Sequence, residues 1–298
     1  MAQSSKVVIV RAKGILSTTQ IDLKRLQAMI IKGLTWLTAE SKVERAVEKI
    51  FSPSDRVGIK INTIGGRLLS TSPELALSLS TVLAQGGLLE RNMVVWDRTN
   101  RELRAAGYSL QTSRDKLKIF GTDAAGAGYE TEPLSFRNIG SLYSTILTNF
   151  VTASISLAIL KDHGLAGVTA GMKNYFGAIH NPNKYHDNHC DPFVAELCAS
   201  PPIKDKHRLT VLDALVVQYH KGPAYHPQWA EPFEGLIFGL DPVATDTVGW
   251  SLIEKMRAAK GLPSLKEEGR PPFYLETAKS LGLGESDLSR LQIIEEQV

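Results

Sequence analysis

The chain has 298 residues, of which 43% are hydrophobic and 22% charged, and its formal net charge is +3. This composition is typical of a globular protein, and so small a charge excess argues against a nucleic-acid-binding protein. No apolar run reaches the ~20 residues that a membrane-spanning helix needs. We therefore expect one globular domain over residues 1–298, with neither a nucleic-acid partner nor a membrane span.

The start of the chain leads directly into a strand-like run, and it lacks the apolar core and cleavage site of a signal peptide. We therefore expect a cytoplasmic protein, or an exported one if a leader has been trimmed from the sequence. The two cysteines, Cys190 and Cys198, are too few for a four-cysteine zinc or iron–sulfur site.

Strands and helices are predicted to alternate through the first half of the chain. Short β-branched runs predict strands, and apolar residues spaced by three and four predict helices. The predicted strands are 6–11, 55–62, 93–96 and 117–120, and the predicted helices are 22–38, 43–51, 72–84 and 101–106. This order predicts a three-layer α/β fold, in which helices cover both faces of a largely parallel or mixed sheet.

The second half of the chain is predicted to be less regular. Strands are expected at 135–137, 146–149, 152–160, 207–216, 235–240 and 291–294, and helices at 167–176, from 192 onward and from 242 to about 259. The stretches 181–191 and 221–232 are polar or proline-rich, so they are predicted loops.

Polar side chains recur where the predicted strands end. They are Lys60 and Asn62, Asp97 and Arg98, Lys161 and His163, Asp213, and Asp241. In open parallel α/β sheets the ligand crevice lies outside the carboxyl ends of the strands, so these residues predict a site there. The alternative is that strand ends are simply where polarity resumes.

A predicted strand–turn–helix spans residues 160–177. Lys161 and His163 precede a small-residue turn with Thr169, and the predicted helix carries Lys173 and Asn174. A helix N-terminus offers unpaired N–H groups to an anion, so the three lysines at 60, 161 and 173 are predicted to converge on one carboxylate or phosphate. The alternative for Lys173 is a solvent-facing position.

All seven histidines lie between His163 and His226. The loop residues His180, His186, His189 and Cys190 form the metal candidate, since imidazole and thiolate suit zinc, iron, copper or nickel. The alternatives are catalytic or ligand-binding histidines without a metal, and a solvated loop. Two later histidines, His220 and His226, flank Gly222-Pro223, and they are expected either to close over the same crevice or to be ordinary loop residues.

The carboxylate of Asp241 precedes Pro242 and a predicted helix. It is placed either to bind a ligand at the strand end or to cap the helix, and capping is the reading that this position favours.

Taken together, these motifs resemble domain-of-unknown-function family 362 over about residues 55–260. The residues that carry the resemblance are Val57–Asn62, Ser72–Glu74, Leu160–His163, Gly167–Thr169, Met172–Asn174 with Gly177, Asp213-Ala214, and Gly239–Asp246. The resemblance implies a shared site without a known reaction. Members are often fused to ferredoxin-type cysteine clusters, which implies a separate iron–sulfur redox partner for this chain. The histidine-rich loop 180–191 lies outside the family pattern.

Three functions follow as hypotheses. The first is an enzyme acting on an anionic small molecule, with Lys161, His163, Lys173 and Asp213 as catalytic residues, Lys60, Asn62, Thr169, Asn174 and Asp241 as ligand-binding residues, and a metal at the histidine-rich loop. The second is a non-catalytic metal- or cofactor-binding protein. The third is a redox accessory protein that works with a separate iron–sulfur partner.

Overall fold

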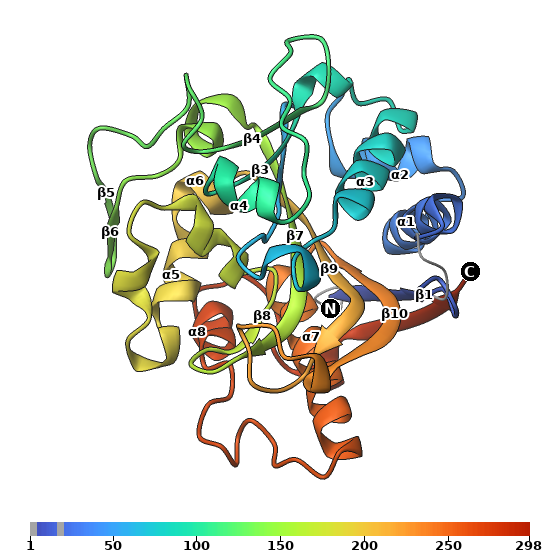
Figure 1. The fold of residues 1–298 in the computed structure, drawn as a ribbon, viewed down its shortest axis with the longest axis vertical. Helices are drawn as coiled ribbons and strands as arrows, with labels where there is room; N and C mark the ends of the chain where they lie inside the picture. Colours follow the sequence, from blue (N-terminus) through green and yellow to red (C-terminus); the bar gives the residue numbers. More distant parts are fainter. Residues whose placement is uncertain (1–4, 17–20) are drawn as a thin grey trace.

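The computed structural model describes residues 5–16 and 21–298, and its centre is a nine-stranded sheet (Figure 1). The strand order is β11-β1-β10-β9-β7-β2-β3-β4, and β8 pairs with β7 outside this path. The strands are β1 (Lys6–Arg11), β2 (Val57–Lys60), β3 (Met93–Asp97), β4 (Lys118–Gly121), β7 (Ala153–His163), β8 (Gly167–Thr169), β9 (His207–Gln218), β10 (Ala230–Gly239) and β11 (Gln292–Gln297). A separate hairpin joins β5 (Leu134–Phe136) and β6 (Ile139–Ser141).

Five neighbouring strands, β9, β7, β2, β3 and β4, run parallel. Their carboxyl ends therefore meet at one edge of the sheet. The strand order also changes direction beside β2, because the chain continues outward to β3 and β4 and later returns to β7 on the other side. Such a reversal is the place where open α/β sheets bind ligands.

Helices cover both faces of the sheet. One core packs against α1 (Leu23–Thr38), α2 (Val43–Ile50), α3 (Pro73–Gln85) and α4 (Asn100–Ala105), and the other packs against α5 (Phe193–Ala199), α6 (Pro201–Lys204), α7 (Pro242–Ala259) and α8 (Tyr274–Ser280). Within β1, Val8 and Val10 enter the first core and Val7 and Ile9 the second, as the two-residue period of a strand requires. The predicted three-layer α/β fold with a mixed, mostly parallel sheet is confirmed.

Two predicted elements are wrong. Residues 146–149 were expected as a strand, but Ile146–Phe150 is a π-helical turn in which the Val151 N–H donates to Ile146 O. Residues 167–176 were expected as a helix, but they form β8 and the start of a 3₁₀ segment, Lys173–Ala178. All ten residues of that stretch are buried, so its apolar spacing reflects burial on every side and not one helical face. The predicted anion site at a helix N-terminus therefore does not exist there.

Among the residues that the structure describes, no helix is long and apolar enough to cross a membrane.

The carboxylate of Asp241 caps α7. It accepts hydrogen bonds from the Ala244 N–H at 2.9 Å, from Ser5 Oγ at 2.6 Å and from the Glu285 N–H at 3.0 Å. All three contacts are structural, and they tie both ends of the described chain to the helix.

We predict that Asp241→Ala lowers the free energy of unfolding by about 1 kcal/mol, because α7 loses its cap. Urea unfolding measures the change. Asp241→Asn is the control: asparagine keeps the oxygen that caps the helix but cannot also accept the Glu285 N–H, so this variant should lose less stability than Asp241→Ala. An equal loss in both variants would contradict the capping role.

Candidate functional site

A polar pocket of about 170 Å³ lies at the carboxyl ends of β2, β3 and β7. It also receives side chains from the 3₁₀ segment Lys173–Ala178 and from the histidine-rich loop 180–191. The predicted site residues that line it are Lys60, Asn62, His163, Thr169, Lys173, Asn174 and His186. The structure therefore brings residues from five separate stretches of the sequence to the predicted edge of the sheet.

The ammonium group of Lys60 is fully engaged within the wall of this pocket. It donates to Asp97 Oδ1 at 2.6 Å, to Ile61 O at 2.7 Å and to Asn174 Oδ1 at 3.2 Å. An ammonium has three protons, so none remains for a ligand. The Asn174 amide is fixed as well, since its Nδ2 donates to Lys60 O and to Ser156 Oγ. Lys60 and Asn174 therefore build the site and offer it no free donor.

The carboxylate of Asp97 completes this wall. Its second oxygen accepts from the Thr63 N–H at 2.8 Å and from Thr63 Oγ1 at 2.7 Å. Gly177 leaves the space that the ion pair needs, because a Cβ there would lie 2.7 Å from Lys60 Nζ and 2.9 Å from Asp97 Oδ1. The sequence placed Asp97 at a strand end but gave no sign that it pairs with Lys60 from the neighbouring strand.

Two other lysines are buried without a carboxylate partner. Among the described residues, the ammonium of Lys161 donates to Leu69 O at 3.3 Å and forms no ion pair, and Lys173 lies over the Phe176 ring at 4.3 Å with none either. Burial lowers the pKa of Lys173 to about 8. Burial, together with the charge of Lys173, also lowers the pKa of Lys161 to about 8. Lys173 lines the pocket, whereas Lys161 lies behind it.

His186 is held in one tautomer beside Lys173. Its Nδ1 lies 3.0 Å from Pro182 O, and because a carbonyl only accepts, Nδ1 carries the proton. Its Nε2 therefore offers a lone pair, which lies 3.3 Å from Lys173 Nζ. Burial and the neighbouring lysine lower the pKa of His186, so the ring is a neutral acceptor for a lysine proton.

His163 is held in the opposite tautomer. Its Nδ1 accepts the backbone N–H groups of Leu165 at 3.2 Å and Ala166 at 3.1 Å, so the proton is on Nε2. Burial and nearby cations lower its pKa to about 2. The ring stacks on His186 with centroids 5.9 Å apart. His163 is thus a neutral hydrogen-bond donor at ordinary pH and not an imidazolium acid.

An unpartnered acceptor faces the same site. Asn62 lines the pocket, and its buried Oδ1 has no hydrogen-bond partner among the described residues. A buried acceptor without a donor is costly, so a bound molecule that donates to it would gain affinity.

Asp246 of α7 holds the turn that delivers Lys173. Its carboxylate accepts from the Gly171 N–H at 2.8 Å and from the Met172 N–H at 3.0 Å, and burial raises its pKa to about 7. Gly171 has no room for a side chain, because a Cβ would lie 2.4 Å from Thr210. Sequence reasoning noted Asp246 only as a second acid near a helix start, since its partners lie far away in the chain.

The predicted closing turn reaches the pocket through Pro223, which lines it. The Gly222 N–H donates to Asp162 Oδ2 at 2.8 Å, and Arg270 pairs with Asp162 Oδ1 at 2.7 Å. A Cβ on Gly222 would lie 1.8 Å from Asp162 O, so only glycine fits. Neither flanking histidine, at 220 or 226, lines the pocket.

Two predicted carboxylates lie outside this pocket. Asp213 is in the middle of β9, not at its end, and the strand's two-residue period directs it toward the face covered by α1–α4. It accepts backbone N–H groups of Leu215 and Ser72, and burial raises its pKa to about 7. Asp241 caps α7. Neither is placed to orient the pocket histidines.

The four predicted metal ligands are not brought together. His180 is exposed with its ring against Tyr129, His189 Nδ1 lies 3.2 Å from Leu165 O, and the Cys190 thiol is buried with its pKa raised by burial. Only His186 lines the pocket. Within residues 5–16 and 21–298, no group of three or more His, Cys, Asp or Glu side chains is placed to hold a metal ion. The transition-metal site stays a prediction, which elemental analysis of the purified protein tests.

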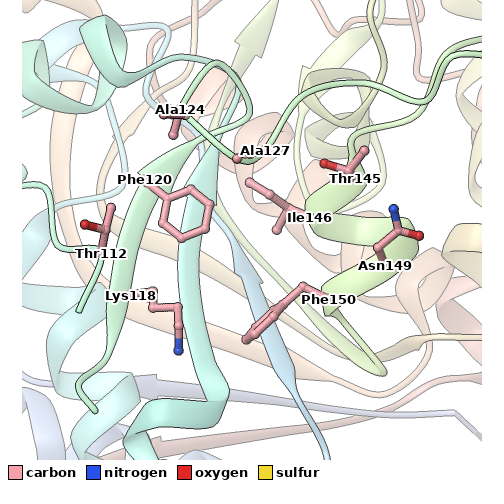
Figure 2. Close-up of a pocket in the computed structure, with 11 residues that line it drawn as sticks. Thr112, Lys118, Phe120, Ala124, Ala127, Thr145, Ile146, Asn149 and Phe150 are labelled. Atoms are coloured by element: carbon pink, nitrogen blue, oxygen red, sulfur yellow. The ribbon is translucent and has the colours of Figure 1, made fainter. Parts of the chain in front are cut away.

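A second hollow lies at the edge strand β4 (Figure 2). Its volume is about 510 Å³, and Figure 2 shows Phe120, Ile146 and Phe150 around it with Lys118 at one side. It is larger than the polar pocket, but Lys118 is its one titratable side chain, whereas seven titratable side chains line the polar pocket: Lys60, Asp97, Arg98, Glu102, His163, Lys173 and His186. We therefore identify the polar pocket as the candidate site by its titratable side chains, although this hollow has the larger volume.

We predict that Asp97→Asn lowers the free energy of unfolding by roughly 3–5 kcal/mol, because it leaves the Lys60 charge buried and unpaired. Arg45→Met is the control: it breaks the exposed Arg45–Glu48 pair of α2, which is worth about 0.5 kcal/mol or less. Urea unfolding compares the two. Similar losses would show that the buried pair does not hold the site.

Comparison with known proteins gives a family and no activity. No curated protein matches the chain. Solved structures that match include a crystal structure of a Thermotoga maritima protein from the Northeast Structural Genomics Consortium, with 12% sequence identity and a TM-score of 0.41. The match covers 81% of this chain, which spans 60% of the length of that protein. The model of the family described as a domain of unknown function (DUF362) matches residues 57–251. This range contains every residue that lines the polar pocket. The chain belongs to this family.

Proposed function

We propose that this protein is an enzyme that acts on a small anionic molecule, bound as a carboxylate or phosphate in the polar pocket. One observation carries the proposal: Lys173 and Arg98 line the pocket, and neither pairs with a carboxylate among the residues that the structure describes. The charges of Lys60 and Asp97 neutralise each other as an ion pair. The remaining charged residues that line the pocket are these two cations and one carboxylate, Glu102, so the pocket has one excess positive charge.

The remaining groups suit a small ligand with both charged and polar atoms. The Arg98 guanidinium can bind a carboxylate or phosphate through two parallel hydrogen bonds. Asn62 Oδ1 lacks a donor, and His163 offers its Nε2–H. Burial of these groups strengthens every charge interaction within the pocket.

The Lys173–His186 pair favours an enzyme over a simple binding protein. An amine with a lowered pKa and a neutral imidazole acceptor, 3.3 Å apart, can pass a proton between them near neutral pH. A binder would gain more from a fully charged lysine paired with its ligand. The redox accessory function rests on family association and stays a prediction.

We expect isothermal titration calorimetry to detect binding of oxalate, inorganic phosphate or pyruvate to the purified protein. Lys173→Met should weaken that binding roughly 10- to 100-fold, the cost of one hydrogen bond to a charged group. Lys116→Met, at an exposed position away from the pocket, is the control and should bind normally. The absence of binding by all three anions would contradict the proposal.

Anion affinity should also depend on pH. Lys173 is an ammonium below its pKa of about 8 and a neutral amine above it, so oxalate affinity should fall by up to tenfold per pH unit once the pH exceeds this pKa of the free protein. Oxalate has no proton to lose in this range. The residual affinity of Lys173→Met should stay flat over the same range, and a parallel fall in the variant would assign the effect to another group.

A further inference from the structure

We propose that the substrate of the polar pocket is a small 2-oxo acid and that Lys173 forms an imine with its keto group. This inference rests on the proposed anion-binding function and deepens it. It starts from the contrast between the two lysines that line one pocket. The Lys60 nitrogen is saturated by three protein acceptors, whereas the Lys173 nitrogen has, among the described residues, one contact within hydrogen-bond distance, His186 Nε2.

The surroundings of Lys173 increase the fraction of the free amine, which is the nucleophilic form, relative to an ordinary lysine. Its side chain is 7% exposed, it lies over the Phe176 ring, and no carboxylate stabilises its charge within the described residues. The pKa is accordingly lowered by burial. A desolvated lysine of this kind is the usual nucleophile toward a carbonyl carbon.

The reaction balances without a further reagent. The Lys173 nitrogen attacks the keto carbon, an N–C bond forms, and the carbonyl oxygen takes one of the two nitrogen protons. The nitrogen then loses a proton, the hydroxyl leaves as water, and a C=N bond remains. His186 Nε2, which carries a lone pair because Nδ1–H is bound to Pro182 O, is placed to take the proton from nitrogen and return it to the leaving hydroxyl.

The other features of the pocket favour a small carboxylic acid as the substrate. Arg98 provides the carboxylate partner, and a cavity of about 170 Å³ restricts the molecule to a small one. The keto group must then lie near Lys173, which lines the same cavity. A 2-oxo acid is the smallest molecule that places a carboxylate directly beside a carbonyl carbon.

Pyruvate with sodium cyanoborohydride tests the proposal, because reduction converts the imine into a stable carboxyethyl-lysine that peptide mass spectrometry locates. We expect one adduct per chain, at Lys173, with saturable dependence on pyruvate and protection by oxalate. Lys173→Met should lose the adduct. Lys118→Met, which alters the lysine of the other hollow, should keep it.

His186→Ala should form the adduct about 100-fold more slowly, the usual contribution of one acid–base group, while Lys173 remains present. Adducts spread over exposed lysines, or none at Lys173 while calorimetry still detects pyruvate, would overturn the imine and leave the anion site intact. No binding of pyruvate, oxalate or phosphate would instead overturn the proposed function itself. Because the adduct is mapped in the unmodified sequence, the result does not depend on a variant that folds.

Discussion

The buried ion pair between Lys60 and Asp97 is the interaction on which the candidate site depends. The two residues end neighbouring parallel strands, and their nitrogen and oxygen lie 2.6 Å apart at 1% and 8% side-chain exposure. Removing two charges from water is costly, and the cost is offset only where every remaining proton and lone pair is satisfied. Here the Asn174 amide, the Ile61 carbonyl and Thr63 supply those partners, so the pair fixes the ends of β2 and β3 to the segment that carries Lys173.

The protonation behaviour of Lys173 differs from that of Lys60, although both lysines line this wall. Lys60 and Lys173 have the same side chain and line the same pocket, but within the described part of the chain only Lys60 has a counter-ion. An ammonium with a carboxylate partner stays charged and rigid, whereas one in a dry site without a partner can give up its proton near neutral pH. The difference lies in the partners and not in the residue type, so no inspection of the lysines alone could assign the two roles.

The sequence predicted the layers of the fold and the edge of the sheet where the polar residues gather. Alternating strands and helices are local patterns, and parallel strands must end together, so Lys60, Asn62 and His163 could be placed in advance. Residues 167–176 could not, because a segment buried on every side has no polar face to show its period. Asp213 was misplaced because β9 continues to Gln218, so the polar residue lies within the strand and not at its end.

The crowded histidines between His163 and His226 show a second limit of sequence reasoning. Crowding of imidazoles in a sequence does not determine where their nitrogens point, and here backbone groups decide it. Nδ1 of His163 accepts two backbone N–H groups. A metal bound at Nε2 would require a proton on Nδ1, which could then no longer accept these hydrogen bonds. His186, held in the opposite tautomer, is the one whose Nε2 lone pair is directed at a pocket lysine.

Lys161 and Lys173, which form no ion pair among the described residues, lower the stability of the fold. Their pKa values of about 8 in the folded protein lie below the ordinary 10.5, so unfolding takes up protons between those limits. The fold is therefore penalised for both charges below about pH 8, and the penalty is relieved as the pH rises toward 10.5. A sequence selected for stability alone would place apolar or paired residues at these positions. Their presence next to a saturated ion pair indicates that the pocket keeps an amine whose charge can change, at a measurable cost to the fold.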